Sequence, residues 1–414
     1  MSGNNKKFTR RDFIKRAGAV GLGSALIPLS DLKQAEGSSS TEMLEPMIVP
    51  TRPFGKTGVN VSILSLGGVL KMSDQLIFRQ ALKMGVSYWD TADSYGRGKN
   101  EKAIGKYFGK FPDDRKKVFL VTKARTSDPK KLTEKLNTSL QRMNTSYVDL
   151  YFLHYVKDAK KELTEEVKTW VEKAKAKGKI RFFGFSAHKN MENSMLAAAK
   201  IGWIDGIMMS YNYRLMVKDK MKKAVDACVK AGIGLTAMKT QASFSANFYS
   251  SIGSETDDAL KMTDNFLKKG YTAEQAKLKA VWENPNIACI CSAMPNMTIL
   301  QANVSAALNK KPLSRGDKQR MEQYAQQTAP GYCAGCTNIC ESEINSEVPI
   351  GDVMRFLMYA RCYGELENAK LHFNNLPLKV LKRMAHIDYK KAEHKCPQRM
   401  DIGGLMREAT TKLL

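Results

Sequence analysis

Eight short apolar runs recur through the middle of the chain, and amphipathic segments separate them. Segments such as Pro129–Met143, Glu165–Ala176 and Lys220–Ala231 have the apolar spacing of helices with one buried face. Continuous apolar strands that alternate with helices predict a parallel sheet, and eight such units in about 250 residues predict an α/β fold closed into a (β/α)8 TIM barrel. The runs are Val61–Leu66, Val86–Trp89, Val118–Thr122, Val148–Leu153, Ile180–Phe185, Gly206–Met209, Gly234–Met238 and Ile287–Cys291.

An open, doubly wound sheet is the alternative architecture. The first run is followed by Gly67-Gly68, which indicates a tight turn, and not by the G-x-G-x-x-G of a dinucleotide-binding crossover. With 43% hydrophobic residues in 414, the chain can bury a large core, which excludes disorder along its whole length. No apolar run reaches the roughly 18 residues of a confident membrane span.

Polar residues stand where several of these strands are expected to end. Asp90 closes the second run, Tyr95 follows it, Lys123 closes the third and His154 closes the fourth. In a barrel of this type the chemistry lies at the carboxyl ends of the strands, so these four side chains are predicted to meet at one mouth. Each has a plain structural alternative as a helix cap, a packing residue, a solvated lysine or a buried histidine. His188, after the fifth run, is a further candidate to face the mouth.

The spacing Asp90-x4-Tyr95, with Lys123 and His154 on the next two strands, resembles the tetrad of the aldo-keto reductase superfamily. The opening Arg52-Pro53-Phe54-Gly55-Lys56-Thr57-Gly58 is similar to the N-terminal hairpin of that family. The resemblance covers about residues 50–310. It implies hydride transfer between a carbonyl or alcohol substrate and a nicotinamide cofactor, NADP or NAD, that lies across the barrel mouth.

The expected chemistry of the four residues is coherent. A free tyrosine has a pKa near 10, and a neighbouring ammonium stabilises the phenolate and lowers that pKa. We therefore expect Lys123, held by Asp90, to acidify Tyr95 as the general acid, or as the base in the oxidative direction. His154 is expected to donate a hydrogen bond to the carbonyl oxygen of the substrate.

The residues that the resemblance assigns to the cofactor match less well. Ala187 and Met208 stand where the family carries Asn and Gln, and Ala293 and Ile299 stand where many members carry Lys and Arg against the 2′-phosphate. Because the bidentate arginine contact is lost, the resemblance does not choose between NADP and NAD. The cofactor-binding candidates are Gly68, Ser186, Met208, Met238, Lys239 and Asn303.

Beyond Pro312 the alternation stops, and Cys333, Cys336 and Cys340 follow within eight residues, with Cys396-Pro397 much later. The C-x2-C-x3-C spacing and the remote Cys-Pro resemble half of a bacterial ferredoxin, although the second gap is one residue longer. A subset of aldo-keto reductases carries such a domain after the barrel. We expect the four cysteines to bind one 4Fe-4S cluster; zinc and disulfides are the alternatives. The stretch Pro349–Tyr363 is expected to be helical.

The first forty residues have the order of an export signal. Arg10-Arg11 and Phe13 precede a weakly apolar stretch from Ala17 to Leu29, which indicates the twin-arginine type. A basic amphipathic helix is the alternative. Lys33 makes the cleavage site poor, so an uncleaved signal that anchors the chain in the membrane stays open. We expect the twin-arginine translocase as a partner and a periplasmic or other extracytoplasmic location.

These features divide the chain into a signal peptide (1–35), a linker (36–50), the barrel (51–311) and a mostly helical cluster domain (312–414). The net charge of +25 comes with lysines spread along helical segments, which favours solvated faces over nucleic-acid binding. The main hypothesis is an exported aldo-keto reductase with an accessory cluster, structural or redox-active. The alternative is an electron-transfer or binding protein that uses the barrel as a scaffold and passes electrons to a partner.

Overall fold

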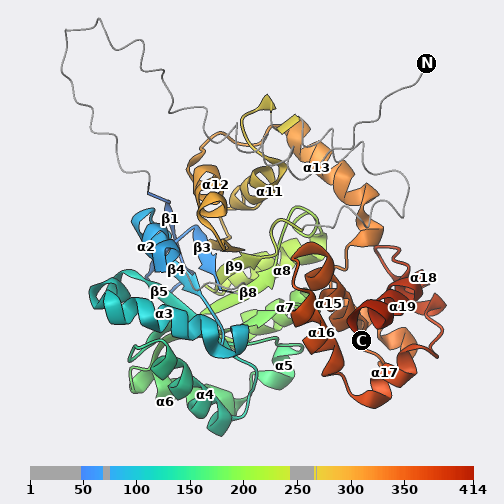
Figure 1. Ribbon diagram of the computed structural model, residues 1–414, viewed down its shortest axis with the longest axis horizontal. Helices are drawn as coiled ribbons and strands as arrows, with labels where there is room; N and C mark the ends of the chain where they lie inside the picture. Colours follow the sequence, from blue (N-terminus) through green and yellow to red (C-terminus); the bar gives the residue numbers. More distant parts are fainter. Residues whose placement is uncertain (1–47, 69–74, 243–264, 267) are drawn as a thin grey trace, which may run out of the picture.

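The computed structural model describes residues 48–68, 75–242, 265–266 and 268–414 of the chain. The predicted signal peptide and most of the linker lie outside this part. Figure 1 shows a barrel built by the first two thirds of the described chain, with a group of helices from the C-terminal third packed against one side. In the part that the structure describes, no helix is both long and apolar enough for a membrane span.

The eight predicted strands form one closed, all-parallel barrel, so the predicted fold class is confirmed and the open sheet is not found. Around the barrel the order is β10-β3-β4-β5-β6-β7-β8-β9. The barrel closes because β10 pairs with both β3 and β9. The strands are β3 (Leu64–Gly67), β4 (Tyr88–Asp90), β5 (Phe119–Ala124), β6 (Val148–Leu153), β7 (Ile180–Ala187), β8 (Gly206–Ser210), β9 (Gly234–Met238) and β10 (Cys289–Ala293).

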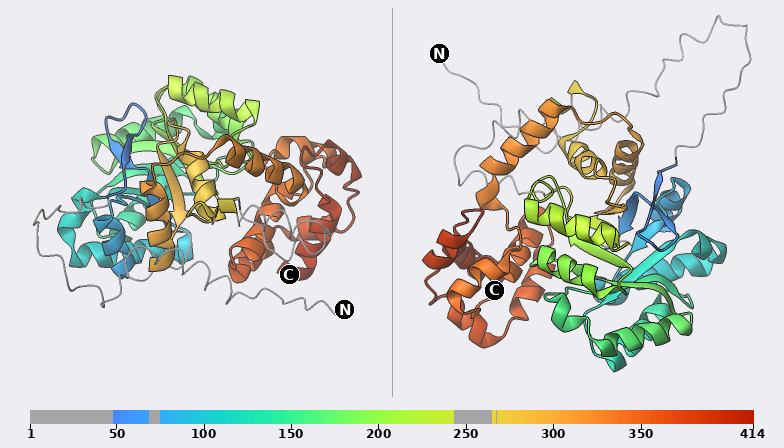
Figure 2. Two further views of the ribbon diagram at one scale, coloured as in Figure 1. Left: turned by 90° about the horizontal axis from the view of Figure 1, so that it is seen from above. Right: turned by 180° about the vertical axis from the view of Figure 1, so that it is seen from behind.

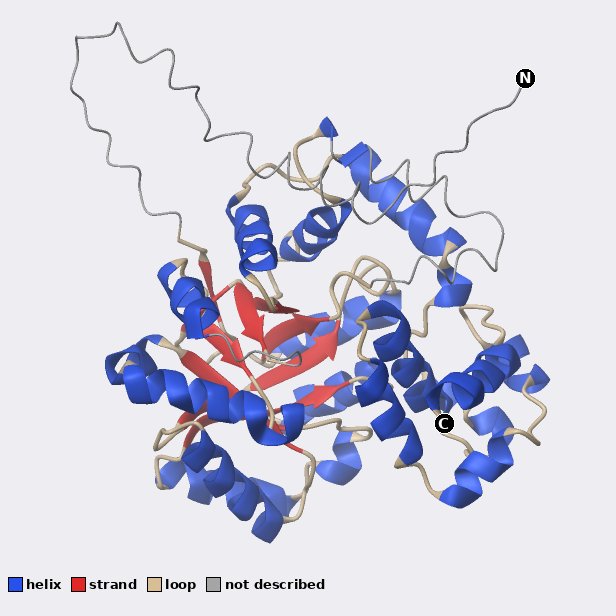
Figure 3. Ribbon diagram, viewed as in Figure 1, coloured by secondary structure: helices blue, strands red, loops and turns tan. Residues whose placement is uncertain are grey.

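Helices surround the barrel, as Figure 3 shows. The predicted helix at 129–143 begins where its sequence favours a start, because the Asp128 carboxylate accepts from Lys131 N and Pro129 occupies the first turn. These helices are α2 (Gln75–Lys83), α3 (Lys99–Lys110), α4 (Pro129–Arg142), α5 (Ala159–Glu162), α6 (Glu165–Ala176), α7 (Met191–Ile201), α8 (Asp219–Lys230), α11 (Ala273–Trp282) and α12 (Met297–Leu308).

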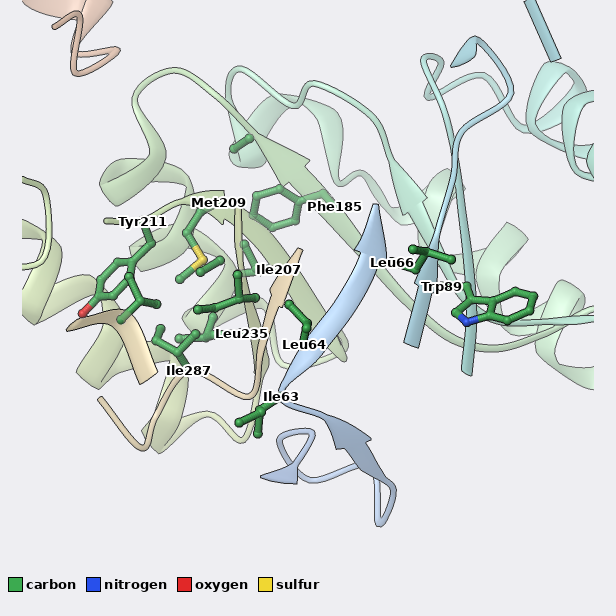
Figure 4. Close-up of a cluster of buried hydrophobic side chains, with 14 of the residues drawn as sticks. Ile63, Leu64, Leu66, Trp89, Phe185, Ile207, Met209, Tyr211, Leu235 and Ile287 are labelled. Carbon is green, nitrogen blue, oxygen red and sulfur yellow. The ribbon is translucent and has the colours of Figure 1, made fainter. Parts of the chain in front are cut away.

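The main core lies between the strands and these helices. Leu66, Trp89, Phe185, Ile207 and Leu235 are all buried and belong to it (Figure 4). A second apolar layer fills the barrel interior, so that each strand is buried on both faces. Because both faces of each strand are buried, the strand sequences are continuous apolar runs.

A hairpin closes the amino-terminal end of the barrel. Its strands β1 (Thr51–Pro53) and β2 (Asn60–Ser62) pair antiparallel, in agreement with the predicted N-terminal hairpin. Phe54 is fully buried there, and a Cβ at Gly206 or Gly234 would lie 2.8 or 2.6 Å from its ring. The two glycines therefore leave room for a ring that fills the barrel floor, opposite the end where chemistry is expected.

The C-terminal helices build a second core. The buried residues from Cys340 to Leu413 form a separate cluster, whereas Met321 and Tyr324 of α13 belong to the barrel core. The second core thus begins at Cys340, well after the predicted boundary at 312. The helices of the second core are α14 (Thr337–Cys340), α15 (Ile350–Cys362), α16 (Leu366–Asn374), α17 (Leu378–Met384), α18 (Lys390–Lys395) and α19 (Ile402–Leu413), and α13 spans Arg315–Gln327. Figure 2 shows the helices of the second core grouped beside the barrel.

The second core is docked on the carboxyl end of β7. Lys189 Nζ donates to Asp352 Oδ2 of α15 over 2.7 Å, and Asn190 N donates to the carbonyl oxygen of Gly335. A Cβ at Gly335 would lie 2.5 Å from the His188 carbonyl oxygen, so only glycine permits this approach. Helix α15, the helix predicted at 349–363, is thereby held against the mouth of the barrel.

Candidate active site

The first two predicted site residues, Asp90 and Lys123, form a buried ion pair. Asp90 ends β4 and Lys123 lies in β5, its neighbour in the barrel. Lys123 Nζ is 2.6 Å from Asp90 Oδ2 and also donates to the carbonyl oxygen of Thr91 over 2.7 Å. Burial raises the pKa of Asp90, and the Lys123 ammonium opposes that rise. The carboxylate therefore fixes the ammonium in one position at the barrel mouth.

Tyr95 lies against this pair, in the short 3₁₀ turn that joins β4 to α3. Lys123 Nζ is 4.9 Å from the centroid of the Tyr95 ring, so the ammonium lies over the ring face. Burial raises the pKa of Tyr95 well above its usual value, and Asp90 raises it further. The pKa of Tyr95 is thus raised where a lowered one was predicted, because burial is the largest contribution and the Lys123 ammonium donates to Asp90 and Thr91.

His154 completes the group. It follows β6, and its backbone N–H donates to Ala124 O at the end of β5. Its ring meets the Tyr95 ring edge to face, with centroids 5.7 Å apart, and the side chain is 4% exposed. Burial lowers the pKa of His154 well below 6.5, and Lys123 lowers it further. The imidazole is therefore neutral at pH 7 and can donate one N–H, while its Nδ1 has no partner among the described residues.

The four side chains thus meet at one end of one barrel, in the order Asp90, Lys123, Tyr95, His154. A protonated phenol and a neutral imidazole next to a fixed ammonium can supply a proton and a hydrogen bond to a carbonyl oxygen.

Comparison with known proteins identifies the family. The aldo/keto reductase family model matches residues 67–286, which is more than half of the chain. The chain belongs to the aldo/keto reductase family.

Its relatives are distant. The "Aldo-keto reductase yakc [NADP(+)]" of Schizosaccharomyces pombe is 27% identical over 40% of this chain and 53% of the relative, so the chain spans about half of that protein's length. The "Uncharacterized oxidoreductase YqkF" of Bacillus subtilis is 25% identical over 67% of this chain and 96% of the relative. The solved holo form of an aldo-keto reductase from Bacillus halodurans shares the fold, with a TM-score of 0.54 and 22% identity over 66% of this chain and 96% of that one.

The residues predicted to bind the family's cofactor differ in what they can contact. The Ser186 hydroxyl accepts from Tyr155 N, and Lys239 directly follows β9. Met208 is buried in the barrel interior, and Met238 packs against the same interior core. Ser186 and Met238 offer a nicotinamide group one hydroxyl and an apolar surface, and so they fit such a group.

The other two cofactor candidates have structural contacts. A Cβ at Gly68 would lie 2.2 Å from Asn100 Oδ1 and 2.7 Å from the Asp90 carbonyl oxygen, so this glycine allows β3 to end close to β4. Asn303, on α12, donates from Nδ2 to Ser292 Oγ over 3.0 Å and is buried. These contacts explain both residue types within the protein itself.

The four predicted cluster ligands surround one cavity. Cys333, Cys336, Cys340 and Cys396 all line an empty volume of about 360 Å³ in the second core. None of these four cysteines forms a disulfide bond, and burial raises the pKa of Cys333 to about 11 and of Cys340 to about 12. In the described ranges, no three His, Cys, Asp or Glu side chains lie close enough together to hold a single metal ion.

Thiolates bind iron–sulfur clusters and zinc, and these four thiols share one cavity.

Three residues at the mouth are functional candidates that the sequence analysis did not predict. Tyr155 has a φ of 67° and stacks on His154 with ring centroids 4.0 Å apart. From α15, Arg355 lies over the Tyr155 ring at 4.8 Å, and the Tyr359 phenol hydrogen-bonds to Tyr155. The position next to His154 could have indicated Tyr155. The two residues of α15 carry no such signal, because only the docking of the second core brings them to the mouth.

Proposed function

We propose that this protein is an oxidoreductase that transfers hydride between a nicotinamide cofactor, NADP or NAD, and a carbonyl or alcohol substrate. The observation that carries the proposal is the Asp90–Lys123 ion pair at 2.6 Å beneath Tyr95, with His154 beside them. Membership of the aldo/keto reductase family supports the same reaction class.

In the proposed reaction each residue of the group has one role. Tyr95, whose raised pKa keeps the phenol protonated at neutral pH, gives its proton to the carbonyl oxygen during reduction and takes it back during oxidation. Neutral His154 donates a hydrogen bond that orients this oxygen. The Lys123 ammonium, fixed by Asp90, stabilises the negative charge left on the phenol. The bound nicotinamide supplies or accepts the hydride.

A Tyr95→Phe variant tests the assignment. Removing the proton donor is expected to lower kcat/KM for aldehyde reduction by at least ~100-fold, since general acid catalysis contributes about 10²–10⁴. The matched control is Tyr147→Phe, which removes a phenol hydroxyl just before β6, at the opposite end of the barrel from the mouth. Tyr95→Phe with unchanged turnover would overturn the role of Tyr95.

We propose further that Cys333, Cys336, Cys340 and Cys396 hold one 4Fe-4S cluster. Support comes from the cavity that all four line and from the absence of disulfides among them. Purified protein is expected to contain four iron and four sulfide per chain and to absorb in the visible range. Cys340→Ser should remove that absorbance, and Cys228→Ser, which changes a buried thiol on α8, should keep it. Stoichiometric zinc instead of iron would reject the cluster.

We propose, finally, that the chain is exported by the twin-arginine route, an inference that rests on the sequence of its first 35 residues. Such transport carries folded proteins, which suits a cluster inserted in the cytoplasm. Changing Arg10-Arg11 to Lys-Lys is expected to retain the protein in the cytoplasm. Equal extracytoplasmic amounts of both forms would contradict export by this route.

A further inference from the structure

A second cavity lies between the barrel mouth and α15. On the barrel side it is lined by His188, Ser210 and Lys239, which stand at the ends of three neighbouring strands. On the other side it is lined by α15 and the loop that carries Cys333. Polar side chains line it on the barrel side, and mostly apolar side chains line it on the α15 side.

Arg355 enters this cavity with an incompletely used guanidinium. Its side chain is 8% exposed, and one terminal nitrogen donates to Asp352 Oδ1 over 2.8 Å. The other oxygen of Asp352 already accepts from Lys189. A single carboxylate therefore serves two cations, and Arg355 Nε is buried without a partner among the described residues. A buried donor without an acceptor destabilises the folded protein, and a ligand that accepts its hydrogen bond removes this cost.

Lys239 adds a second positive group to the same cavity. In the part of the chain that the structure describes, no carboxylate forms an ion pair with its Nζ, which lies 6.0 Å from the Tyr359 ring centroid. Burial lowers the pKa of Lys239 to about 7, and the positive charge of Arg355 lowers it further. His188 Nδ1 is also buried there without a partner within the described ranges. Three nitrogen-bearing side chains therefore face one space, and Arg355 is the one among them with a permanent positive charge.

We propose that Arg355, Lys239 and His188 form a binding site for an anionic oxygen group, and that the group is the carboxylate of the carbonyl substrate. This proposal rests on the proposed function, because it makes the substrate an oxo-acid. A planar guanidinium matches a carboxylate, and an ammonium beside it adds charge.

The surroundings support a substrate over a free ion. Met354, Leu357, Met358 and Leu405 also line the cavity, so an apolar carbon chain can be buried behind the anionic group. One aromatic ring, that of Tyr155, separates Arg355 from His154, at 4.8 Å and 4.0 Å respectively. The Tyr155 ring therefore contacts both Arg355 and the residue that would orient a substrate carbonyl.

Equilibrium binding tests the site without any need for turnover. The full-length protein with its cofactors is titrated in a calorimeter with cyclohexanecarboxylate and with its neutral counterpart, cyclohexanecarboxamide, at 0.15 M salt. The acid is expected to bind at least tenfold more tightly than the amide. Arg355→Gln should remove this preference, and Lys239→Gln, which leaves the Asp352 contacts intact, should reduce it. Equal affinities of the native protein for acid and amide would overturn the proposal.

One control variant and two further measurements distinguish a substrate carboxylate from a nucleotide phosphate and from general attraction by a basic protein. Arg181→Gln removes one charge at the start of β7, away from the mouth, and should keep the preference, which excludes general attraction by the basic protein. A loss of NADP⁺ but not NAD⁺ affinity in Arg355→Gln would retain the anion site but assign it to a nucleotide phosphate. Tyr95→Phe should bind the acid normally even if it turns nothing over. Acid binding that survives Arg355→Gln and Lys239→Gln would overturn the proposed residues.

Discussion

Lys189, just after β7, and Asp352, on α15, join the barrel to the second core through a largely buried ion pair of 2.7 Å. The same carboxylate holds Arg355, so the residue that fixes the second core also positions a guanidinium at the barrel mouth. Docking and site assembly therefore depend on one side chain.

Lys189→Met is expected to destabilise the docked state by about 1.5–3 kcal/mol, the usual contribution of a hydrogen bond to a charged group, because Asp352 keeps Arg355 as a partner. Asp352 and Arg355 should then lose their fixed positions, and cyclohexanecarboxylate binding should weaken. Denaturant unfolding and calorimetry measure the two effects.

The comparison variant is Lys168→Met, which removes an exposed partner of Glu165 on α6. An exposed pair contributes only about 0–1 kcal/mol, so this change should leave stability nearly unaltered. Equal stabilities of the two variants would show that the Lys189–Asp352 pair does not hold the second core in place.

The loop at Gly335 offers a second test of docking. Its φ is 80°, and a Cβ would lie 2.5 Å from the His188 carbonyl oxygen. Gly335→Ala therefore combines backbone strain with a clash against the barrel. Gly178→Ala, at a φ of 66° with open space around it, carries the strain alone, of about 1 kcal/mol. The first variant should unfold at a clearly lower denaturant concentration than the second; matching midpoints would mean that the loop moves away at no cost.

The sequence predicted the barrel well because its strands are buried on both faces and its helices on one. The helix at Glu165–Ala176 has the predicted bounds, and all eight apolar runs became strands. These are local patterns whose period is set by backbone geometry. The start of the second core was less predictable, because α13 looks like a separate helix but packs on the barrel.

The catalytic group could be located from strand ends, but its electrostatics could not. The direction of the Tyr95 pKa shift is set first by burial, which raises it, and the burial of a loop residue depends on the packing of the whole mouth. Arg355 could not be assigned to the mouth, since 200 residues separate it in sequence from Tyr155, the ring it covers. Such contacts come only from the packing of one core on the other.

Burial of His154 predicts a loss of stability in acid. Its pKa in the folded protein lies well below 6.5, whereas in the unfolded chain it is about 6.5. Below pH 6.5 His154 binds a proton in the unfolded state but stays neutral in the folded state. The free energy of unfolding is therefore highest above that pH and decreases as the pH falls. The free energy of unfolding should drop by up to about 1.4 kcal/mol per pH unit between pH 6 and 5 from this group.

His154→Asn should reduce that slope when urea unfolding is measured from pH 7.5 to 5. His188→Asn is expected to act in the same direction, because burial also lowers the pKa of His188 well below 6.5. Identical slopes for the native protein and both variants would show that neither imidazole is kept neutral by the fold.

The Asp90–Lys123 pair allows folding and catalysis to be separated. Asp90→Asn leaves the Lys123 ammonium buried at 1% exposure without its counter-charge, and this should cost about 3–5 kcal/mol of stability. Adding Lys123→Met removes the buried charge, so the double variant should regain most of that stability in denaturant unfolding. Aldehyde reduction should nevertheless stay at least ~100-fold below the native rate in both variants, because neither has a fixed ammonium beside Tyr95. If the double variant recovered turnover together with stability, the pair would be structural and the proposed proton transfer would not need it.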